Sequence, residues 1–180
     1  RRDGSTGFYV YHSAVSPAKT LYLYGTTAAE TYAAAYNNTA STSSVFSVGS
    51  AAATNSGNML AYCFAPVAGY SAFGSYTGNG SADGPFVFTG HRSRWIMIKR
   101  TDSTGDWLIY DTARDEINAA TKRLYPNLSN AEADASDQAL DILSNGFCIK
   151  GGSNANYNAS GGAYVYASFA EHPFKTARAR

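Results

Sequence analysis

Two short apolar runs on either side of a polar turn decide the fold class. They are Trp95-Ile96-Met97-Ile98-Lys99 and Trp107-Leu108-Ile109-Tyr110-Asp111, separated by Arg100-Thr101-Asp102-Ser103-Thr104-Gly105-Asp106. Tryptophan, isoleucine and tyrosine favour strands, and a polar cluster with a glycine favours a reversal of the chain. The sequence therefore predicts a β-hairpin here.

The same pattern of apolar runs and turn residues recurs along the whole chain. In the C-terminal half it predicts further strands at residues 86–88, 146–150 and 163–169, the second of them after a tight turn at Asn145-Gly146. In the N-terminal half it predicts strands at residues 8–11, 21–24, 45–48 and 59–64. Residues 28–36 and 114–123 are expected to form turns or short helices. So many short strands predict an all-β fold of the β-sandwich or jelly-roll type.

The chain also resembles itself at a nearly constant offset. Ser5-Thr6-Gly7 matches Ser103-Thr104-Gly105 at an offset of 98, and Phe64-Ala65 matches Phe169-Ala170 at an offset of 105. Between these ends the matches keep their order, as in Tyr11-His12-Ser13-Ala14 and Tyr110-Asp111-Thr112-Ala113. A unit of about 100 residues is too long for a solenoid repeat and has the size of one small β-sandwich.

We therefore expect two related β repeats, residues 1–70 and residues 71–180. The second contains residues 71–99 ahead of its Ser-Thr-Gly turn, whereas the first begins almost at that turn. The first repeat is thus expected to be incomplete at its N-terminus, and the sequence to be the C-terminal piece of a longer polypeptide. Upstream residues or another chain would complete the first repeat, because an open sheet edge would otherwise be exposed.

Composition excludes several classes of protein. Of the 180 residues, 15 % are charged and 14 % are aromatic, and the net charge is +1. Intrinsic disorder needs few aromatic residues, and coiled coils need many charged ones. The small net charge gives no electrostatic signal for nucleic acid, and the basic residues of the last six positions are too few to change this. No run is long enough to cross a membrane, so we expect no membrane insertion.

Cysteines and histidines give no sign of a metal site or a disulfide framework. Cys63 and Cys148 are expected to be buried free thiols. His12, His91 and His172 are scattered without metal-ligand spacing, so neither a metal nor another cofactor is expected.

Acidic residues and glycines offer weak candidates for chemistry. Carboxylates gather around the hairpin, where they suit either a solvated face or, less simply, calcium binding or glycoside hydrolysis: Asp102, Asp106, Asp111, Asp115 and Glu116. The first repeat keeps only Asp3 and Glu30, which favours the solvated face. Glu30 and Glu132 recur in both repeats, and we expect a structural role such as holding a turn. Residues 78–84 are rich in glycine, but their spacing suits a plain turn better than a phosphate loop.

Aromatic side chains offer a candidate sugar-binding platform. Trp95 and Trp107 lie within strand runs, which favours burial in the core. Tyr70, Tyr76 and Tyr157 are the better candidates for the surface. No catalytic, cofactor-binding or metal-binding residue is assigned, and the identity of any glycan- or receptor-binding residue stays open.

Several segments resemble a domain of unknown function from tailed bacteriophages. They are Ala61-Tyr62-Cys63-Phe64-Ala65-Pro66-Val67-Ala68-Gly69-Tyr70, Gly74-Ser75-Tyr76-Thr77-Gly78-Asn79-Gly80, Trp95-Ile96-Met97-Ile98-Lys99-Arg100, Tyr110-Asp111-Thr112-Ala113-Arg114, Leu143-Ser144-Asn145-Gly146-Phe147 and Tyr166-Ala167-Ser168-Phe169-Ala170-Glu171 with Pro173-Phe174 and the Ala-Arg end. One departure is His91-Arg92-Ser93-Arg94, where an aromatic residue followed later by proline is more usual. We expect only a local loop change from it.

The resemblance implies a C-terminal part of a large virion or tail-fibre protein. It leads us to expect a non-enzymatic structural module on the outer surface of the virion, in a tail or fibre, with a role in host attachment. Fibres of this kind are usually homotrimers, so the expected partners are further copies of the chain, other virion proteins and host surface glycans. The alternatives are a carbohydrate-binding, lectin-like module and a capsid decoration protein. A glycan-cleaving enzyme would need two carboxylates at a fixed separation in a cleft.

Overall fold

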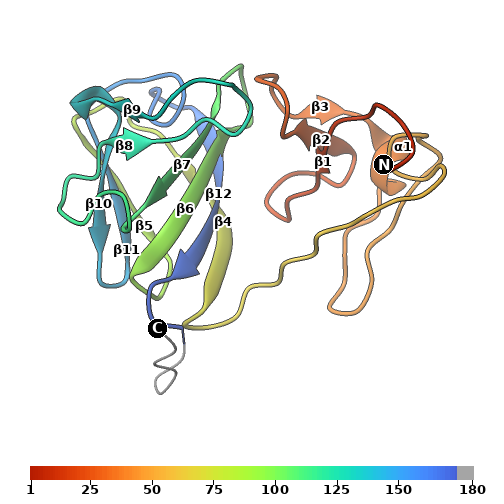
Figure 1. The fold of residues 1–180 in the computed structure, drawn as a ribbon, viewed down its shortest axis with the longest axis horizontal. Coiled ribbons are helices and arrows are strands. Elements are labelled where there is room, and N and C mark those ends of the chain that lie inside the picture. The colour runs from red at the N-terminus through yellow and green to blue at the C-terminus, as the bar shows by residue number, and fades with distance from the viewer. Residues whose placement is uncertain (174–180) are drawn as a thin grey trace.

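The computed structural model describes residues 1–173, and the chain folds into two parts that lie side by side (Figure 1). Residues 1–66 form the N-terminal part and residues 67–173 the C-terminal part. Phe174 and the basic end of the chain, including Lys175 and Arg180, lie outside the described residues. The whole arrangement is built from antiparallel strands and loops, which confirms the all-β fold class.

The C-terminal part is a sandwich of two antiparallel sheets. One sheet has four strands in the order β4-β12-β6-β7, and the other has three in the order β10-β11-β5. A small pair, β8-β9, lies beside β7 through a bridge between Ile109 and Leu124. The bounds are β4 Ser71–Thr77, β5 Asp83–Phe88, β6 Ser93–Arg100, β7 Trp107–Asp111, β8 Lys122–Arg123, β9 Ala133–Asp134, β10 Ala139–Leu143, β11 Gly146–Lys150 and β12 Ala163–Ala170, with a 3-10 turn, η1, at Ser136–Gln138.

Strand alternation places the core between the two sheets. In β6, Ile96 and Ile98 are fully buried, while Trp95 and Met97 lie on the opposite face of the same strand. The inward side chains form one cluster, whose largest buried members are Ile96, Ile98, Leu108, Tyr110, Leu140, Ile142, Phe147, Ile149, Tyr157 and Tyr164. Burial of each large apolar side chain of this kind stabilises a fold by about 1.5–3 kcal/mol.

The N-terminal part has little regular structure. Its sheet has the order β1-β2-β3, with β1 at Tyr9–Val10, β2 at Lys19–Tyr22 and β3 at Glu30–Thr31. One short helix, α1, spans Ala33–Tyr36 and ends where Asn37 adopts a left-handed conformation with φ of 54°. Residues 59–66 then run as an extended segment towards the C-terminal part (Figure 1).

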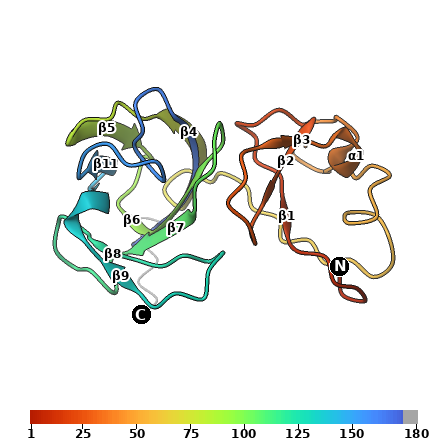
Figure 2. The ribbon, with the colours of Figure 1, turned by 90° about the horizontal axis from the view of Figure 1, so that it is seen from above.

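The two parts share an apolar contact. Figure 2 shows the N-terminal part against the side of the sandwich that β4, β12, β6 and β7 form. Leu21 of β2 is buried there with Trp107 and Val165, and Val10 and Met97 pack around them. The outer face of the four-stranded sheet is therefore partly a second core.

Two polar side chains of the sandwich fix the N-terminal part in place. The indole Nε1 of Trp107 donates to the carbonyl of Tyr22 at 2.8 Å. The Lys99 ammonium is buried and donates to the carbonyls of Thr26 at 3.2 Å and Thr27 at 2.9 Å, and to a third carbonyl at the end of its own strand. Burial lowers the pKa of Lys99 to about 8. The side chain still carries its proton at neutral pH.

The predicted hairpin and the strong strand predictions are confirmed. The two runs form β6 and β7, which pair directly, and a tight turn precedes Gly146 between β10 and β11. The predictions for residues 86–88, 146–150 and 163–169 fall within β5, β11 and β12, and those near residues 8–11 and 21–24 overlap β1 and β2.

Other predictions of elements are wrong. Residues 45–48 and 59–64 are not strands. Residues 114–123, expected to form turns or short helices, form turns and end in β8. Only the end of the segment 28–36 is helical, because β3 occupies Glu30–Thr31. The strands β4 and β10 were not predicted from the sequence. The internal repeat and its boundary between residues 70 and 71 stay predictions.

Replacement of Lys99 tests the contact between the two parts. In Lys99→Met, the buried ammonium and its hydrogen bonds to the carbonyls of Thr26 and Thr27 are lost, and a hydrogen bond to a charged group contributes about 1.5–3 kcal/mol. We expect the free energy of unfolding in urea to fall by about 2 kcal/mol. The matched control is Lys150→Met, because Lys150 pairs with the exposed Asp83 and a pair of this kind contributes about 0–1 kcal/mol. Equal stability of the two variants would contradict the prediction.

The ring of His12 predicts a loss of stability in acid. Its Nδ1 accepts the N–H of Ala14 at 3.1 Å, so Nε2 carries the proton and donates to the carbonyl of Tyr166 in β12, also at 3.1 Å. Burial lowers the pKa of His12 below its ordinary value of 6.5. The folded state therefore binds a second ring proton less readily than the unfolded state does. The contribution of His12 to the free energy of unfolding is complete above pH 6.5 and falls as the pH drops towards the folded-state pKa.

The measurement compares the free energy of unfolding at about pH 7.5 and about pH 5. In His12→Asn, an amide oxygen can still accept the N–H of Ala14 but nothing titrates, so we expect a smaller loss on acidification than in the unaltered chain. The exposed His172 gives the control, His172→Asn, which should keep the full loss. An unchanged pH dependence in His12→Asn would show that this ring is not responsible.

Candidate functional site

Five aromatic side chains gather on the part of the outer sheet face that the N-terminal part leaves uncovered. Phe73 of β4, Trp95 of β6 and Phe169 of β12 share this face because the register places Phe169 opposite Trp95, and Phe73 opposite the residue two before Phe169. Phe64 of the extended segment and Tyr70 of the turn before β4 complete the group. We call these five residues the aromatic patch.

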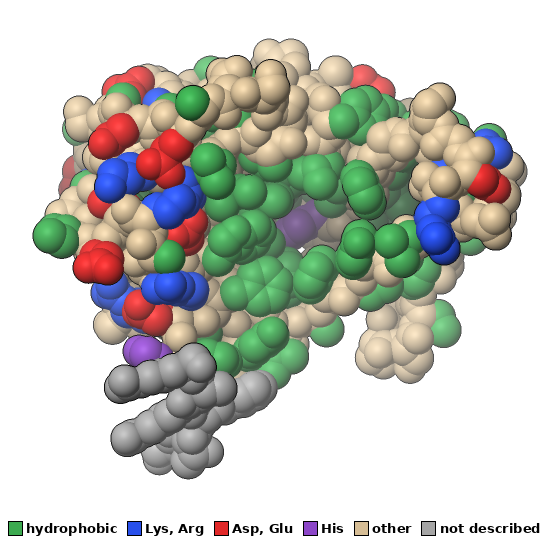
Figure 3. Space-filling model, viewed as in Figure 1, with side chains coloured by type: hydrophobic (Ala, Val, Ile, Leu, Met, Phe, Trp, Pro, Cys, Tyr) green, Lys and Arg blue, Asp and Glu red, His purple; other side chains and the backbone are tan. Residues whose placement is uncertain are grey.

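Phe169 is the centre of the aromatic patch. Its ring centroid lies 5.7 Å from that of Phe64, 6.0 Å from Tyr70, 5.8 Å from Phe73 and 5.6 Å from Trp95. The first three pairs are edge-to-face, an arrangement that aromatic quadrupoles favour. Phe64 is 66 % exposed and Tyr70 is 38 % exposed. In Figure 3, hydrophobic side chains fill the hollow between the two parts of the molecule.

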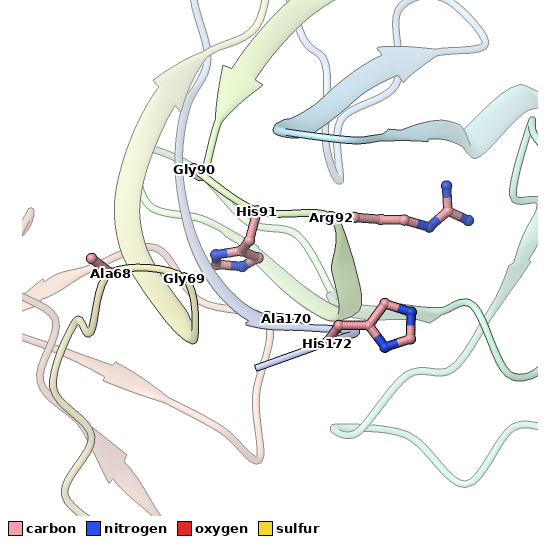
Figure 4. Close-up of a pocket in the computed structure, with 7 residues that line it drawn as sticks. All are labelled: Ala68, Gly69, Gly90, His91, Arg92, Ala170 and His172. Carbon is pink, nitrogen blue, oxygen red and sulfur yellow. The ribbon is translucent and has the colours of Figure 1, made fainter. Parts of the chain in front are cut away.

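An open pocket of about 560 Å³ lies at the end of the sandwich next to the turn that carries Tyr70 (Figure 4). Its walls come from the loop before β6, the turn before β4 and the end of β12, and they comprise Ala68, Gly69, Gly90, His91, Arg92, Ala170 and His172. Figure 4 shows the imidazole of His91 beside Gly69, while the side chain of Arg92 points away from it. Arg92 donates instead to Glu171 at 2.6 Å.

His91 belongs to a buried chain of polar groups. Its Nε2 lies 2.9 Å from Oγ of Ser168, and that oxygen lies 2.7 Å from Oγ of Ser93. Burial lowers the pKa of His91, which keeps the ring neutral at pH 7. Its Nδ1 is buried and has no hydrogen-bond partner among the described residues.

The buried group of His91, Ser168 and Ser93 does not have the geometry of a nucleophilic site. A serine nucleophile must reach substrate, and its histidine is held by an acceptor on the second ring nitrogen. Ser168 and Ser93 are both fully buried, and within residues 1–173 no carboxylate contacts Nδ1 of His91. The group therefore closes the end of the core with polar side chains.

The carboxylates around the hairpin serve the fold. Asp102 accepts from Arg100 at 2.8 Å, which lowers the pKa of its carboxyl, and Asp111 accepts from Arg114 at 2.6 Å. Asp115 accepts the backbone N–H groups of Thr121 and Lys122, and Asp106 accepts from Asn127 at 2.8 Å. Glu116 is exposed to solvent. The four aspartates hold neighbouring side chains and turns of the fold in place.

The two recurring glutamates also have structural partners, but not backbone groups as in the turn that we suggested as an example. Glu30 accepts from the hydroxyl of Tyr22 at 3.0 Å, and Glu132 accepts from Arg114 at 2.7 Å. The glycine-rich residues 78–84 span the end of β4, a turn and the start of β5. The side chain of Asn158 holds that turn through the N–H of Asn79 and the carbonyl of Ser81.

The predictions for aromatic and thiol side chains need correction. Trp107 is 4 % exposed, as expected, but Trp95 is only half-buried and joins the aromatic patch. Tyr157 is fully buried and Tyr76 packs against the core, because their hydroxyls find carbonyl partners inside. Of the three tyrosines expected at the surface, only Tyr70 lies there.

The thiols are free but not buried. Cys63 is exposed on the extended segment, and Cys148 is half-buried in β11. Within residues 1–173, no three histidine, cysteine or acidic side chains come close enough together to hold a metal ion. In the same residues, no helix has both the length and the apolar character that crossing a bilayer requires.

Sequence reasoning missed the phenylalanines of the aromatic patch. Phe73 stands between Ala72 and Gly74, and Phe169 stands between Ser168 and Ala170, so in each strand a large aromatic residue alternates with small residues of the other face. This alternation could not show which of the two faces would stay uncovered.

Comparison with known proteins gives a family and no activity. Residues 1–173 match a domain of unknown function, DUF7483. No curated protein sequence and no solved structure is significantly similar to the chain. Because the match extends over almost the entire sequence, the chain belongs to the DUF7483 family.

Proposed function

We propose that this chain is a non-enzymatic structural module of a tailed-bacteriophage virion, in a tail fibre or another surface part that takes part in host attachment. The observation that carries the proposal is the aromatic patch, which is an exposed group of rings on a rigid sheet. Contiguous exposed apolar side chains mark interaction surfaces, and aromatic residues are enriched at the centres of protein interfaces. The phage origin itself rests on the resemblance of the sequence segments quoted above.

The aromatic patch supports assembly more strongly than sugar binding. A sugar platform needs flat ring faces turned to solvent together with polar groups that fix the hydroxyls. Here three of the four contacts of Phe169 are edge-to-face, so several rings present their edges and cover one another's faces. We therefore propose a homo-oligomer, a trimer by analogy with fibres, that buries the aromatic patch between copies or against other virion proteins. A lectin-like module and a capsid decoration protein are the alternatives.

Light scattering after size-exclusion chromatography tests this proposal. We expect the unaltered chain to have a mass near three times 19.1 kDa. The variant Phe64→Ser with Tyr70→Ser should shift the mass towards one copy, since both side chains are exposed in the aromatic patch. The matched control is Phe88→Ser, because Phe88 is 65 % exposed on β5, on the other sheet. This control should keep the mass of the unaltered chain.

Two outcomes would overturn the assembly role. One is a single-copy mass of the unaltered chain at all concentrations, and the other is the same oligomer in the patch variant and the control. A glycan array with the same three proteins separates the alternatives, because binding that disappears only in the patch variant would favour the lectin-like module. Mass spectrometry of purified particles of the phage that encodes the chain tests the virion location, and absence of the chain from the particles would contradict it.

A further inference from the structure

The pocket at the end of the sandwich has an imidazole beneath it that is only half satisfied. His91 lines the pocket and is 7 % exposed. Its Nε2 lies 2.9 Å from Oγ of Ser168, but its Nδ1 is buried and has no hydrogen-bond partner among residues 1–173. Buried polar atoms without a partner are rare in folded proteins, so this nitrogen points to a group that the chain itself does not supply.

Two buried serines determine which ring nitrogen of His91 carries the proton. The hydroxyl of Ser93 has one partner within the described part of the chain, Oγ of Ser168 at 2.7 Å. If Ser93 donates to Ser168 and Ser168 donates to Nε2, both hydroxyl protons have acceptors and the ring proton lies on Nδ1. The opposite arrangement leaves two groups without a partner, the hydroxyl proton of Ser93 and Nδ1. The first arrangement is therefore favoured, because each unpaired buried group is costly.

Nδ1 of His91 is thus an unpaired donor just beneath the pocket. Figure 4 shows the imidazole beside the turn that carries Ala68 and Gly69. In the same wall, the backbone N–H groups of Gly69 and of His91 itself have no acceptor among residues 1–173. These three groups are all donors, so the site lacks an acceptor.

The charges next to the pocket favour an acceptor that carries negative charge. Glu171 lies 2.6 Å from Arg92 and 3.8 Å from Arg94, so two cations share one carboxylate there. The side chain of Arg92 points away from His91 (Figure 4) and its Nε is bound to Glu171. Among the lining residues, no guanidinium is thus available for the bidentate contact that a phosphate prefers. A singly charged anion suits the site better.

The wall over Nδ1 is thin and can make room for a small ligand. Ala68, Gly69, Gly90 and Ala170 line the pocket with a methyl group or no side chain. A Cβ atom at Gly69 would meet no other atom within 4 Å apart from its chain neighbours. Ala68 and Gly69 also form no backbone hydrogen bond with any described residue. An outward shift of this tip would uncover Nδ1 without breaking a bond of the sandwich.

We propose that this pocket binds a small carboxylate, one oxygen of which accepts the Nδ1 proton of His91. A carboxylate carries one negative charge and offers only acceptors, which is what the unpaired donors of the wall require. Ser168 is a positioning residue, because its hydroxyl holds the ring proton on Nδ1. The sequence after Pro173 contains three basic residues and no acidic one, so its side chains cannot supply the carboxylate. The proposal does not depend on the virion role.

The position of the ring proton tests the first step of the proposal. Nuclear magnetic resonance of imidazole nitrogens in the unaltered chain at neutral pH distinguishes a protonated Nδ1 from a protonated Nε2. We expect the proton of His91 on Nδ1. His12 is the internal reference with the proton on Nε2, because its Nδ1 accepts the N–H of Ala14. A proton on Nε2 of His91 would overturn the proposal, since the pocket would then lack its central donor.

Titration of the unaltered chain with sodium acetate tests binding. The resonances of the Gly69 amide and of the His91 ring are followed at constant ionic strength, which sodium chloride maintains. We expect both to shift and to saturate together. Acetamide has nearly the same shape without the charge, and we expect it to bind about tenfold more weakly or less. Sodium phosphate should also bind more weakly than acetate. Equal binding of acetate and acetamide, or shifts that do not saturate, would contradict the proposal.

Variants locate the acetate site. His91→Phe removes the donor and should abolish the saturable shift of the Gly69 amide. Since this change also leaves Ser168 without its partner, Ser168→Ala gives a second arm that keeps the ring: its proton should no longer be confined to Nδ1, and acetate should bind more weakly. The matched control is His12→Asn, which alters a buried neutral histidine of the other part and should bind acetate as the unaltered chain does. Unchanged binding in both His91→Phe and Ser168→Ala would overturn the proposal.

A shortened chain that ends at Pro173 shows which residues hold the acetate. We expect it to bind acetate as the full chain does, because the donors named above all precede that residue. Loss of binding in the shortened chain would show that later residues form the site, which would overturn the proposal. None of these results affects the test of the aromatic patch, whose variants and readout are different.

Discussion

The rest of the structure depends on the pairing of β12 with two strands at once. This last strand lies between β4 and β6, so it joins the beginning of the sandwich to the hairpin. Side chains of β12 alternate between the two faces of the sheet, and each set has different contacts. Tyr164, Tyr166 and Ser168 point into the sandwich, while Val165 and Phe169 point outward, one to the contact with the N-terminal part and the other to the aromatic patch. A shift of one residue would exchange the two faces and remove the core, the contact and the aromatic patch together.

Tyrosine explains how a chain with few charges can hold long loops. The hydroxyl of Tyr110 donates to the carbonyl of Gln138, and that of Tyr76 donates to the carbonyl of Tyr157. The hydroxyl of Tyr164 donates to the carbonyl of Ala155 in the loop before β12. Each ring fills the core while its hydroxyl satisfies a loop carbonyl that would otherwise be buried without a partner. Five of the 14 tyrosines act as internal connectors of this kind: Tyr76, Tyr110, Tyr157, Tyr164 and Tyr166.

The local sequence predicted the hairpin, but it could not predict pairings between residues that are distant in the chain. β6 and β7 are neighbours in the chain, and their apolar runs identify them directly. β4 has the sequence Ser-Ala-Phe-Gly-Ser-Tyr-Thr, which lacks an apolar run, and it becomes a strand because β12 pairs along its whole length. Conversely, residues 45–48 and 59–64 have the pattern of strands and no partner to pair with. Propensity indicated where strands can form, and the presence of a neighbour decided where they do.

The candidate site could be predicted only in part for the same reason. Of the aromatic residues singled out, Trp95 and Tyr70 lie in the aromatic patch, but the burial of Tyr157 and the outward position of Phe169 depend on loops and on distant strands. The carboxylates around the hairpin were expected on a solvated face, whereas Asp102, Asp111 and Asp115 bind arginine side chains or backbone amides of the fold. The buried pair of His91 and Ser168 joins residues 77 positions apart, and no local pattern could have revealed it.

The contact of Trp107 and Val165 with Leu21 has a consequence for how the molecule can be divided. A cut before Ser71 looks natural in the sequence, because a complete sandwich follows it. Such a cut would expose the indole of Trp107 and the ammonium of Lys99 on an apolar face and remove their acceptors in the N-terminal part. Divisions that are visible in the chain need not be units of folding, and here the smaller part acts as the lid of the larger one's outer face. The solubility of a fragment that begins at Ser71 would therefore represent that of the whole chain poorly, even though the sandwich of the fragment is intact.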